Sequence, residues 1–179
     1  AVFGGFNLME FKTDGNTIVN QLRIEQHIVE ELECSLLLYY GGVSRSSAKI
    51  IDEQIKNTKS KNEKTMEAMH QLKQNAYVMK DEVLIGNMAG FAELLRSTWE
   101  NKKKTSSIIS NRDLENTINY AMEHGAEAVK VSGAGGGGFL MFYYNPINRQ
   151  KLIDALKLLE GMVYPVNFSK MGVKSWVIK

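Results

Sequence analysis

Residues 128–144 read Ala-Val-Lys-Val-Ser-Gly-Ala-Gly-Gly-Gly-Gly-Phe-Leu-Met-Phe-Tyr-Tyr, and this stretch determines how the rest of the chain is interpreted. Gly133, Gly135 and Gly138 fit the dinucleotide-binding pattern G-x-G-x-x-G, but that pattern must open a helix. Here the bulky run from Phe139 to Tyr144 follows, and such residues favour a strand. We therefore predict a loop between two strands, which argues against a dinucleotide fingerprint. A P-loop is also disfavoured, because it needs Gly-Lys-Ser/Thr.

The glycine run itself predicts a functional loop. A long run of Gly and Ala loses much backbone entropy on folding, so it needs a compensating use. A wide hairpin connection would need only two glycines, whereas close approach of backbone N–H groups to an anion uses several. We predict that the loop lines a phosphate or substrate cleft through Gly133, Ala134, Gly135, Gly136, Gly137 and Gly138. Lys130 fits a role beside this loop and a solvated strand position equally well.

A second candidate site is Gly42-Val43-Ser44-Arg45-Ser46-Ser47, which follows the apolar run Leu36 to Tyr40 and precedes a helical pattern. The free N–H groups and the dipole at the start of a helix suit an anion. Arg45 adds a planar fork that matches phosphate or carboxylate. An N-cap serine beside a surface arginine explains the same residues equally well.

Other conspicuous residues favour structural interpretations. Lys102, Lys103 and Lys104 end a predicted helix, where cations offset the carbonyl dipole. Trp99 suits the core better than a site. The three histidines show no ligand spacing with the single cysteine, Cys34, so we expect no metal held by protein side chains alone.

Composition limits the class of protein. The chain has 179 residues, 44% of them hydrophobic and 23% charged, which is ordinary for a soluble globular protein. A formal net charge of +2 is too small to indicate a nucleic-acid partner. No apolar stretch approaches the length of a membrane span, and we expect no signal peptide. A lone cysteine cannot form an intrachain disulfide, which fits the cytoplasm.

Hydrophobic periodicity predicts the order of elements. We expect a β-hairpin over 3–24, a short helix or loop over 25–33, a strand over 36–40, helices over 44–57, 63–85, 88–103 and 110–124, strands over 127–132 and 138–144, a helix over 145–160, and strands over 162–168 and 173–178. Ser110 to Asp113 fits a capping box, and Asn145-Pro146 fits an N-cap with proline in the first turn. This order predicts an α+β fold, a ferredoxin-like split βαβ sandwich with a helical insertion.

Several of these segments resemble a known family. Val131 to Phe139 is similar to the third conserved motif of the GHMP small-molecule kinases. Residues 3–7, 42–47, 99–103 and 106–111 together resemble the heptose 7-phosphate kinase branch of that family. The resemblance implies that 31–179 form the GHMP kinase C-terminal domain. It implies that 1–30 are a β-hairpin from the end of the N-terminal kinase domain.

The resemblance also implies an activity. GHMP kinases transfer the γ-phosphate of ATP with Mg²⁺, in the heptose branch to the anomeric hydroxyl of a heptose 7-phosphate. The loop from Gly133 to Gly138 would line the active-site cleft. We expect Ser44, Arg45, Ser46 and Ser47 to meet the sugar substrate at its distal phosphate.

The chain departs from the family in one respect. The family's nucleotide loop, Pro-x-x-x-Gly-Leu-Gly-Ser-Ser-Ala, does not occur in it, and the catalytic Asp is expected upstream of Ala1. We therefore expect a C-terminal half of a longer kinase, which needs its N-terminal half and is inactive alone.

Three alternatives stay open at this point. The first is another GHMP sugar kinase, similar to fucokinase or galactokinase. The second is an RNA-binding module that uses Tyr143 and Tyr144, although the nearly neutral net charge of the chain lacks the excess of basic residues that such proteins have. The third is a regulatory domain that senses a metabolite. The oligomeric state is open in each case.

Overall fold

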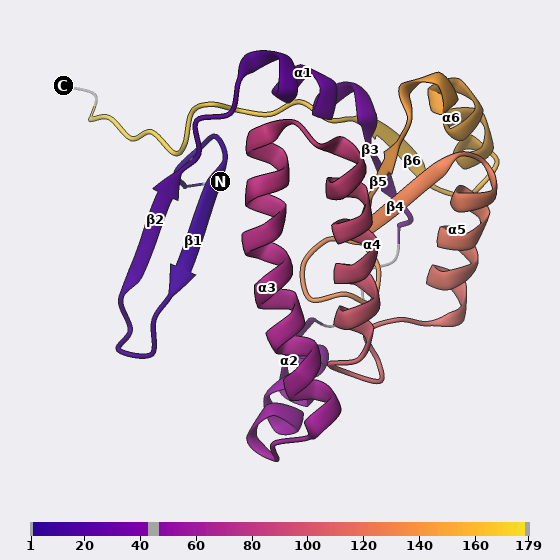
Figure 1. Ribbon diagram of the computed structural model, residues 1–179. Helices are drawn as coiled ribbons and strands as arrows, with labels where there is room; N and C mark the ends of the chain where they lie inside the picture. The colour runs from indigo at the N-terminus through magenta and orange to yellow at the C-terminus, as the bar shows by residue number, and fades with distance from the viewer. Residues whose placement is uncertain (1, 43–46, 178–179) are drawn as a thin grey trace.

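The computed structural model describes residues 2–42 and 47–177. Within them the chain forms a separate two-stranded hairpin and a four-stranded sheet with helices on both faces (Figure 1). The elements are β1 (Asn7–Phe11), β2 (Thr17–Gln21), α1 (Gln26–Ser35), β3 (Leu36–Tyr40), α2 (Ser47–Lys59), α3 (Glu63–Ile85), α4 (Met88–Lys103), α5 (Arg112–Glu123), β4 (Ala126–Val131), β5 (Phe139–Tyr144), the 3₁₀ turn η1 (Pro146–Asn148), α6 (Arg149–Lys157) and β6 (Met162–Pro165). None of the described helices is both long and apolar enough to cross a membrane.

The four-stranded sheet has the order β4-β5-β3-β6 and is antiparallel throughout. Its first strand, β3, therefore lies between the third strand and the last, as in a split βαβ fold. The helices α2, α3, α4 and α5 all lie between β3 and β4 along the chain. The predicted α+β class and the ferredoxin-like sandwich with a helical insertion are confirmed.

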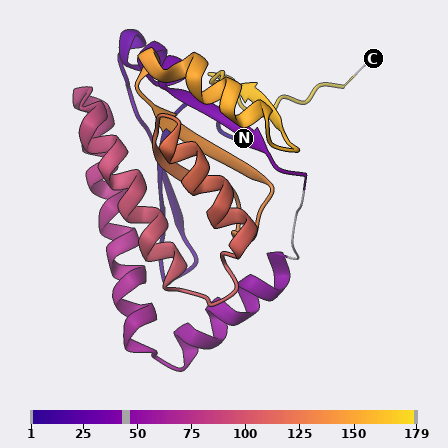
Figure 2. The same ribbon diagram turned by 90° about the vertical axis from the view of Figure 1, so that its right-hand side faces the viewer.

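Side chains from the two faces of the sheet form two cores. The helices α5 and α6 cover one face of the sheet (Figure 2). On this face Leu37, Phe142 and Tyr144 are buried in a cluster with residues of both helices. On the other face Leu36 and Tyr143 pack against α1 and α4, and the Tyr143 ring meets Phe91 edge to face at 5.8 Å. Because Tyr143 and Tyr144 are 6% and 1% exposed, neither ring is free to stack on an RNA base.

The two long helices begin and end at the predicted residues. The Asn62 side chain caps α3 by accepting from the Thr65 amide, and Gly86 ends that helix in the left-handed conformation with φ 73°. The Asn87 side chain then caps α4 by accepting from the Gly90 amide. The Gly86-Asn87 pair therefore stops one helix and starts the next, so that α3 and α4 lie side by side (Figure 1).

Two sequence predictions are wrong in detail. Asn111, not Ser110, caps α5, since its side chain accepts from the Leu114 amide at 3.0 Å. The Ser110 hydroxyl donates instead to the Glu115 carboxylate. The strand expected over 173–178 is absent from the described residues up to 177, where the chain is irregular after Pro165.

The C-terminal residues run beside the N-terminus rather than along the main sheet. The Gly5 amide donates to the Ser169 carbonyl at 2.8 Å, and the Val173 amide donates to the Val2 carbonyl at 3.0 Å. This segment therefore bonds to the N-terminal residues without forming the predicted strand.

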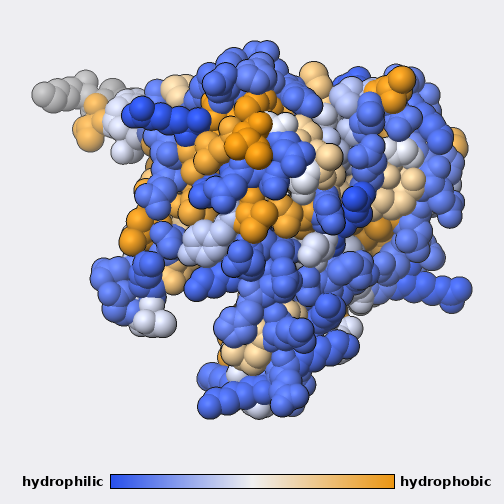
Figure 3. Space-filling model, viewed as in Figure 1, coloured by the Kyte–Doolittle hydropathy of each residue, from blue (hydrophilic) through white to orange (hydrophobic). Residues whose placement is uncertain are grey.

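The hairpin leaves apolar surface exposed. Hydrophobic residues gather over the hairpin and between it, α1 and α3 (Figure 3). A cavity of about 290 Å³ lies between the hairpin, α3, α4 and the sheet, and most of its lining is apolar. Large apolar side chains of the hairpin and of the two chain ends stay exposed, namely Val2, Phe3, Phe11, Met171, Val173, Trp176 and Val177.

Candidate active-site cleft

The glycine loop, residues 133–138, connects β4 to the antiparallel strand β5, so the predicted loop between two strands is confirmed. All five of its glycines have positive φ, between 70° and 125°. Residues with a Cβ rarely adopt this backbone conformation, which explains why glycine fills these positions. Ala134 has no positive φ, and its methyl group packs against the core. The pattern Gly-Ala-Gly-Gly-Gly-Gly therefore follows from the backbone of the loop.

The loop rests on the connection between α4 and α5. The Gly136 amide donates to the Ile109 carbonyl at 2.8 Å. A Cβ at Gly135 would lie 2.5 Å from Ile109 Cγ1 and 3.0 Å from the Ile109 oxygen. At the other end the Gly41 amide, just after β3, donates to the Gly138 carbonyl at 3.3 Å. Two segments distant in sequence thus hold the loop in place.

Several amides of the loop have no acceptor in the described protein, and of the loop residues Gly136, Gly137 and Gly138 line the neighbouring cavity. Among the described residues, no oxygen accepts from the amides of Ala134, Gly135, Gly137 or Gly138. Successive N–H groups in positive-φ conformations form concave anion sites. The loop therefore has the backbone chemistry of a phosphate-binding site.

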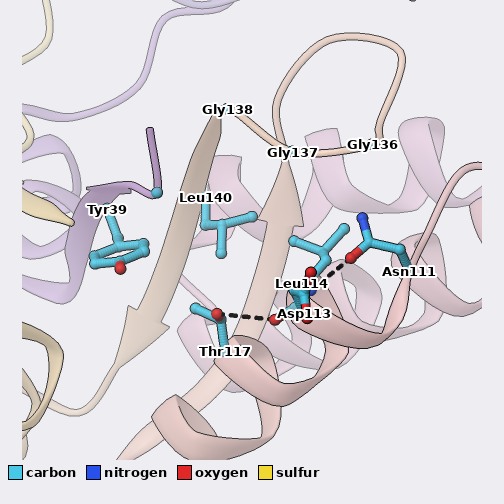
Figure 4. Close-up of a pocket in the computed structure, with 10 residues that line it drawn as sticks. Tyr39, Asn111, Asp113, Leu114, Thr117, Gly136, Gly137, Gly138 and Leu140 are labelled. Atoms are coloured by element: carbon cyan, nitrogen blue, oxygen red, sulfur yellow. Dashed lines mark hydrogen bonds between the residues drawn. The ribbon is translucent and has the colours of Figure 1, made fainter. Parts of the chain in front are cut away.

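A small cavity lies beside the loop, between the end of β3 and the start of α5 (Figure 4). It is lined by Tyr39, Gly41, Asn111, Asp113, Leu114, Thr117, Gly136, Gly137, Gly138 and Leu140. Its volume of about 120 Å³ is below the ~300–1,000 Å³ of common ligand pockets. The cavity can thus hold only part of a ligand.

The polar side chains that line this cavity are those of Tyr39, Asn111, Asp113 and Thr117. Burial raises the pKa of Tyr39, with a further contribution from Glu160, so its hydroxyl stays protonated at neutral pH. The Asn111 side chain is occupied by the α5 cap. The Thr117 hydroxyl donates to the Asp113 carbonyl at 3.0 Å, and the exposed Asp113 also lines the cavity. The backbone of Gly136, Gly137 and Gly138 completes the lining, and backbone amides suit a reaction that depends on orientation and charge neutralisation.

Lys102 contacts the glycine loop, and the sequence interpretation missed this. Its Nζ donates to the Gly133 carbonyl at 2.6 Å and to the Val131 carbonyl at 3.5 Å. Trp99 is 4% exposed, so its predicted place in the core is confirmed. Lys102 follows Trp99 by three residues and therefore lies on the same, inward side of α4. That spacing was the available signal.

The neighbouring lysines have other partners. Lys103 pairs with Glu100 at 2.8 Å and lies 5.7 Å from the centre of the Trp99 ring. The Lys104 Nζ donates to Asn101 Oδ1 at 3.0 Å. Only Lys102, of these three, bonds to the loop.

The helix α2 holds the α4–α5 connection. The Glu53 carboxylate accepts from the Ser106 hydroxyl at 2.7 Å, and from the Ser107 amide and hydroxyl at 3.2 and 2.8 Å. These hydrogen bonds keep the pKa of Glu53 below its usual value. Because Ile109 lies in the same connection and supports the glycine loop, α2 is linked to the loop through it.

The second predicted site, residues 44–47, lies mostly outside the described residues. Ser44, Arg45 and Ser46 lie outside the described residues, and Ser47 is the exposed first residue of α2. Gly41, two residues before the undescribed segment, lines the cavity beside the glycine loop. No histidine, cysteine, aspartate or glutamate side chains within 2–42 and 47–177 gather in threes that could hold a metal ion.

Comparison with known proteins identifies relatives over the whole chain. Residues 66–159 match the family model described as GHMP kinases C terminal. The chain is 42% identical over 178 residues to the D-glycero-alpha-D-manno-heptose 7-phosphate kinase of Campylobacter jejuni, covering 99% of this chain and 52% of that protein.

Solved structures give the same result. A D-glycero-D-manno-heptose 1-phosphate kinase from Bacteroides thetaiotaomicron superposes with a TM-score of 0.70 at 36% identity, over 99% of this chain and 46% of that one. The mevalonate kinase of L. major superposes with a TM-score of 0.74 over 91% of this chain and 48% of that one. Its 17% identity supports the fold alone. The chain spans about half the length of these relatives.

Proposed function

Since this chain belongs to the GHMP kinase family, we propose that it is the C-terminal part of an ATP-dependent sugar kinase. The kinase transfers the γ-phosphate to the anomeric hydroxyl of a heptose 7-phosphate. The observation that carries this proposal is the glycine loop, whose free amides lie in a chain 42% identical to a heptose 7-phosphate kinase. Phosphoryl transfer depends on positioning and charge stabilisation more than on covalent chemistry, and such a loop supplies both.

The proposal divides the chain at residue 30. Residues 1–30 complete the N-terminal kinase domain as a hairpin, and 31–179 form the C-terminal domain. Two features support a separate hairpin: β1 and β2 form a sheet of their own that pairs with no strand of the main sheet, and Met9, Phe11 and Ile18 are exposed. These features support the hairpin and not the boundary at residue 30, which falls within α1. The preceding half of the relatives' length would cover that surface. We refer to this chain together with that half as the intact kinase.

ATP and Mg²⁺ belong to the same proposal. The residues present fit a phosphate, because free amides of the loop can donate to its oxygens. No ligand set for Mg²⁺ is found among the described side chains, so we assign none of them to the metal. We propose that the nucleotide loop and the catalytic carboxylate lie in the other half. A cytoplasmic location follows from the need for ATP, and it suits the free, exposed Cys34.

A substrate panel tests the proposed reaction. With ATP and Mg²⁺, the intact kinase should phosphorylate heptose 7-phosphate with a kcat/KM at least about a hundredfold above that for fucose or galactose, because a site built to bind a phosphate leaves its polar groups unpaired when the sugar carries none. The product should carry the new phosphate at the anomeric carbon, as judged by ³¹P NMR. A preference for fucose or galactose would contradict the heptose assignment and would favour another sugar kinase of the family.

Arg45 is proposed to bind the distal phosphate of the sugar. Replacing Arg45 by Met in the intact kinase should raise KM for the sugar phosphate about tenfold or more and leave KM for ATP within about twofold, since a charge-assisted bond contributes about 1.5–3 kcal/mol. Lys56→Met is the matched control, because it removes one exposed positive charge from the last turn of α2. An unchanged KM for the sugar phosphate would refute the role of Arg45.

A further inference from the structure

The ammonium group of Lys102 lies behind the glycine loop and meets its carbonyl side. It bonds the Gly133 carbonyl at 2.6 Å and the Val131 carbonyl at 3.5 Å, where β4 ends and the loop begins. Its neighbours Lys103 and Lys104 point to other partners. Of these three lysines, Lys102 is therefore the one that bonds to the loop.

The direction of this bond matters for the amides. In a trans peptide the C=O and N–H groups point in opposite directions. Holding the Gly133 carbonyl toward Lys102 therefore turns the Ala134 N–H away from α4. The next donors, Gly135 and Gly137, follow in the same loop, and Gly136 is already fixed by Ile109. Lys102 and Ile109 thus restrain the loop from two sides.

The surroundings of Lys102 disfavour the charged form of its ammonium group. Its side chain is half-buried, and no carboxylate of the described residues pairs with it. Burial, with a smaller contribution from the positive charge of Lys130 on β4, lowers the pKa of Lys102 to about 8. A group placed only for stability would not need a desolvated charge next to another cation. An anion at the loop would offset both charges.

We propose that Lys102 is a positioning residue for phosphoryl transfer, which holds the carbonyls at the start of the glycine loop so that the loop's free amides face the transferred phosphate. This inference rests on the proposed kinase function. It goes beyond that function by assigning the orientation of the loop to one side chain of α4. Lys102 acts through the loop and does not touch the substrate.

The test is Lys102→Met in the intact kinase. We expect kcat to fall about ten- to a hundredfold, because a misplaced loop loses interactions made in the transition state, while KM for the sugar phosphate stays within about twofold. The unfolding midpoint should not fall, since the variant also removes a desolvated charge. Lys102→Arg, which keeps the cation and the donors, should restore most of kcat. The matched control, Lys104→Met, removes an exposed lysine from the same helix end and should change none of these values.

A second readout does not depend on activity. Hydrogen exchange of the loop peptide that contains the Gly136 amide should become faster in Lys102→Met and stay unchanged in Lys104→Met. Faster exchange in a protein that phosphorylates no sugar would support the loop-holding role and refute only the kinase function. Unchanged exchange with unchanged kcat would overturn the proposal, and so would a kcat loss that follows a lower unfolding midpoint. If Lys102→Met does not fold, Lys102→Gln is measured in the same way.

Discussion

Replacing Gly135 by alanine in the intact kinase is expected to lower kcat/KM for the sugar phosphate by about a hundredfold or more. Gly135 has φ 114°, where a residue with a Cβ is strained by about 1–3 kcal/mol. The new Cβ would also lie 2.5 Å from Ile109 Cγ1, so the loop or Ile109 must move. A shift of about 1 Å in a phosphate-positioning loop is enough to cost about a hundredfold in rate.

Alanine variants of two other glycines separate the effect of backbone strain from that of a steric clash. Gly133 has φ 70° and no atom within 4 Å of its would-be Cβ, so Gly133→Ala adds strain alone and should lose less activity than Gly135→Ala. Gly15 has φ 86° in the remote hairpin turn, also in open space. Gly15→Ala should lower the free energy of unfolding by about 1 kcal/mol and leave kcat/KM unchanged. Steady-state kinetics with thermal unfolding on the three variants distinguishes these cases. Equal activity in Gly135→Ala and Gly15→Ala would contradict a positioning role for the loop.

Local signals in the sequence predicted the parts of the fold that local chemistry determines. Gly86 and Asn87 stop one helix and cap the next through bonds within four residues, so the ends of α3 and α4 could be predicted to the residue. The glycine loop was equally predictable, because positive φ at five positions admits little but glycine. The choice between Ser110 and Asn111 as the cap of α5 was harder. Both residues can cap a helix, and the Glu115 carboxylate engages Ser110.

Contacts between distant segments could not be predicted in this way. Ile109 supports the glycine loop from 27 residues away along the chain, and Lys102 holds it from 31 residues away. The sequence around these two residues does not indicate that role. An isoleucine is typical of the hydrophobic core, and a run of lysines is typical of the end of a helix. Only the packing of α4 against β4 brings them to the loop. The irregular end of the chain is a similar case. The Val173 amide bonds to the Val2 carbonyl from the other end of the chain, where the sequence alone predicted a strand over 173–178.

Residues 1–179 alone are expected to show no measurable phosphorylation of heptose 7-phosphate, at least about ten-thousandfold below the intact kinase. The glycine loop is only one wall of a cleft, and its cavity of about 120 Å³ cannot orient a sugar, a nucleotide and a base together. Adding the separately expressed N-terminal half should restore activity if it covers the exposed apolar side chains of the hairpin and of the C-terminal segment, where Phe11 is 76% and Trp176 78% exposed. Contaminating host kinases are controlled by a Gly135→Ala version of the same chain, which copurifies with the same contaminants. Activity of residues 1–179 that disappears in that version would show that the chain alone is a complete kinase. Equal activity in the unchanged chain and in its Gly135→Ala version would come from a contaminant and would be consistent with the expected inactivity of residues 1–179.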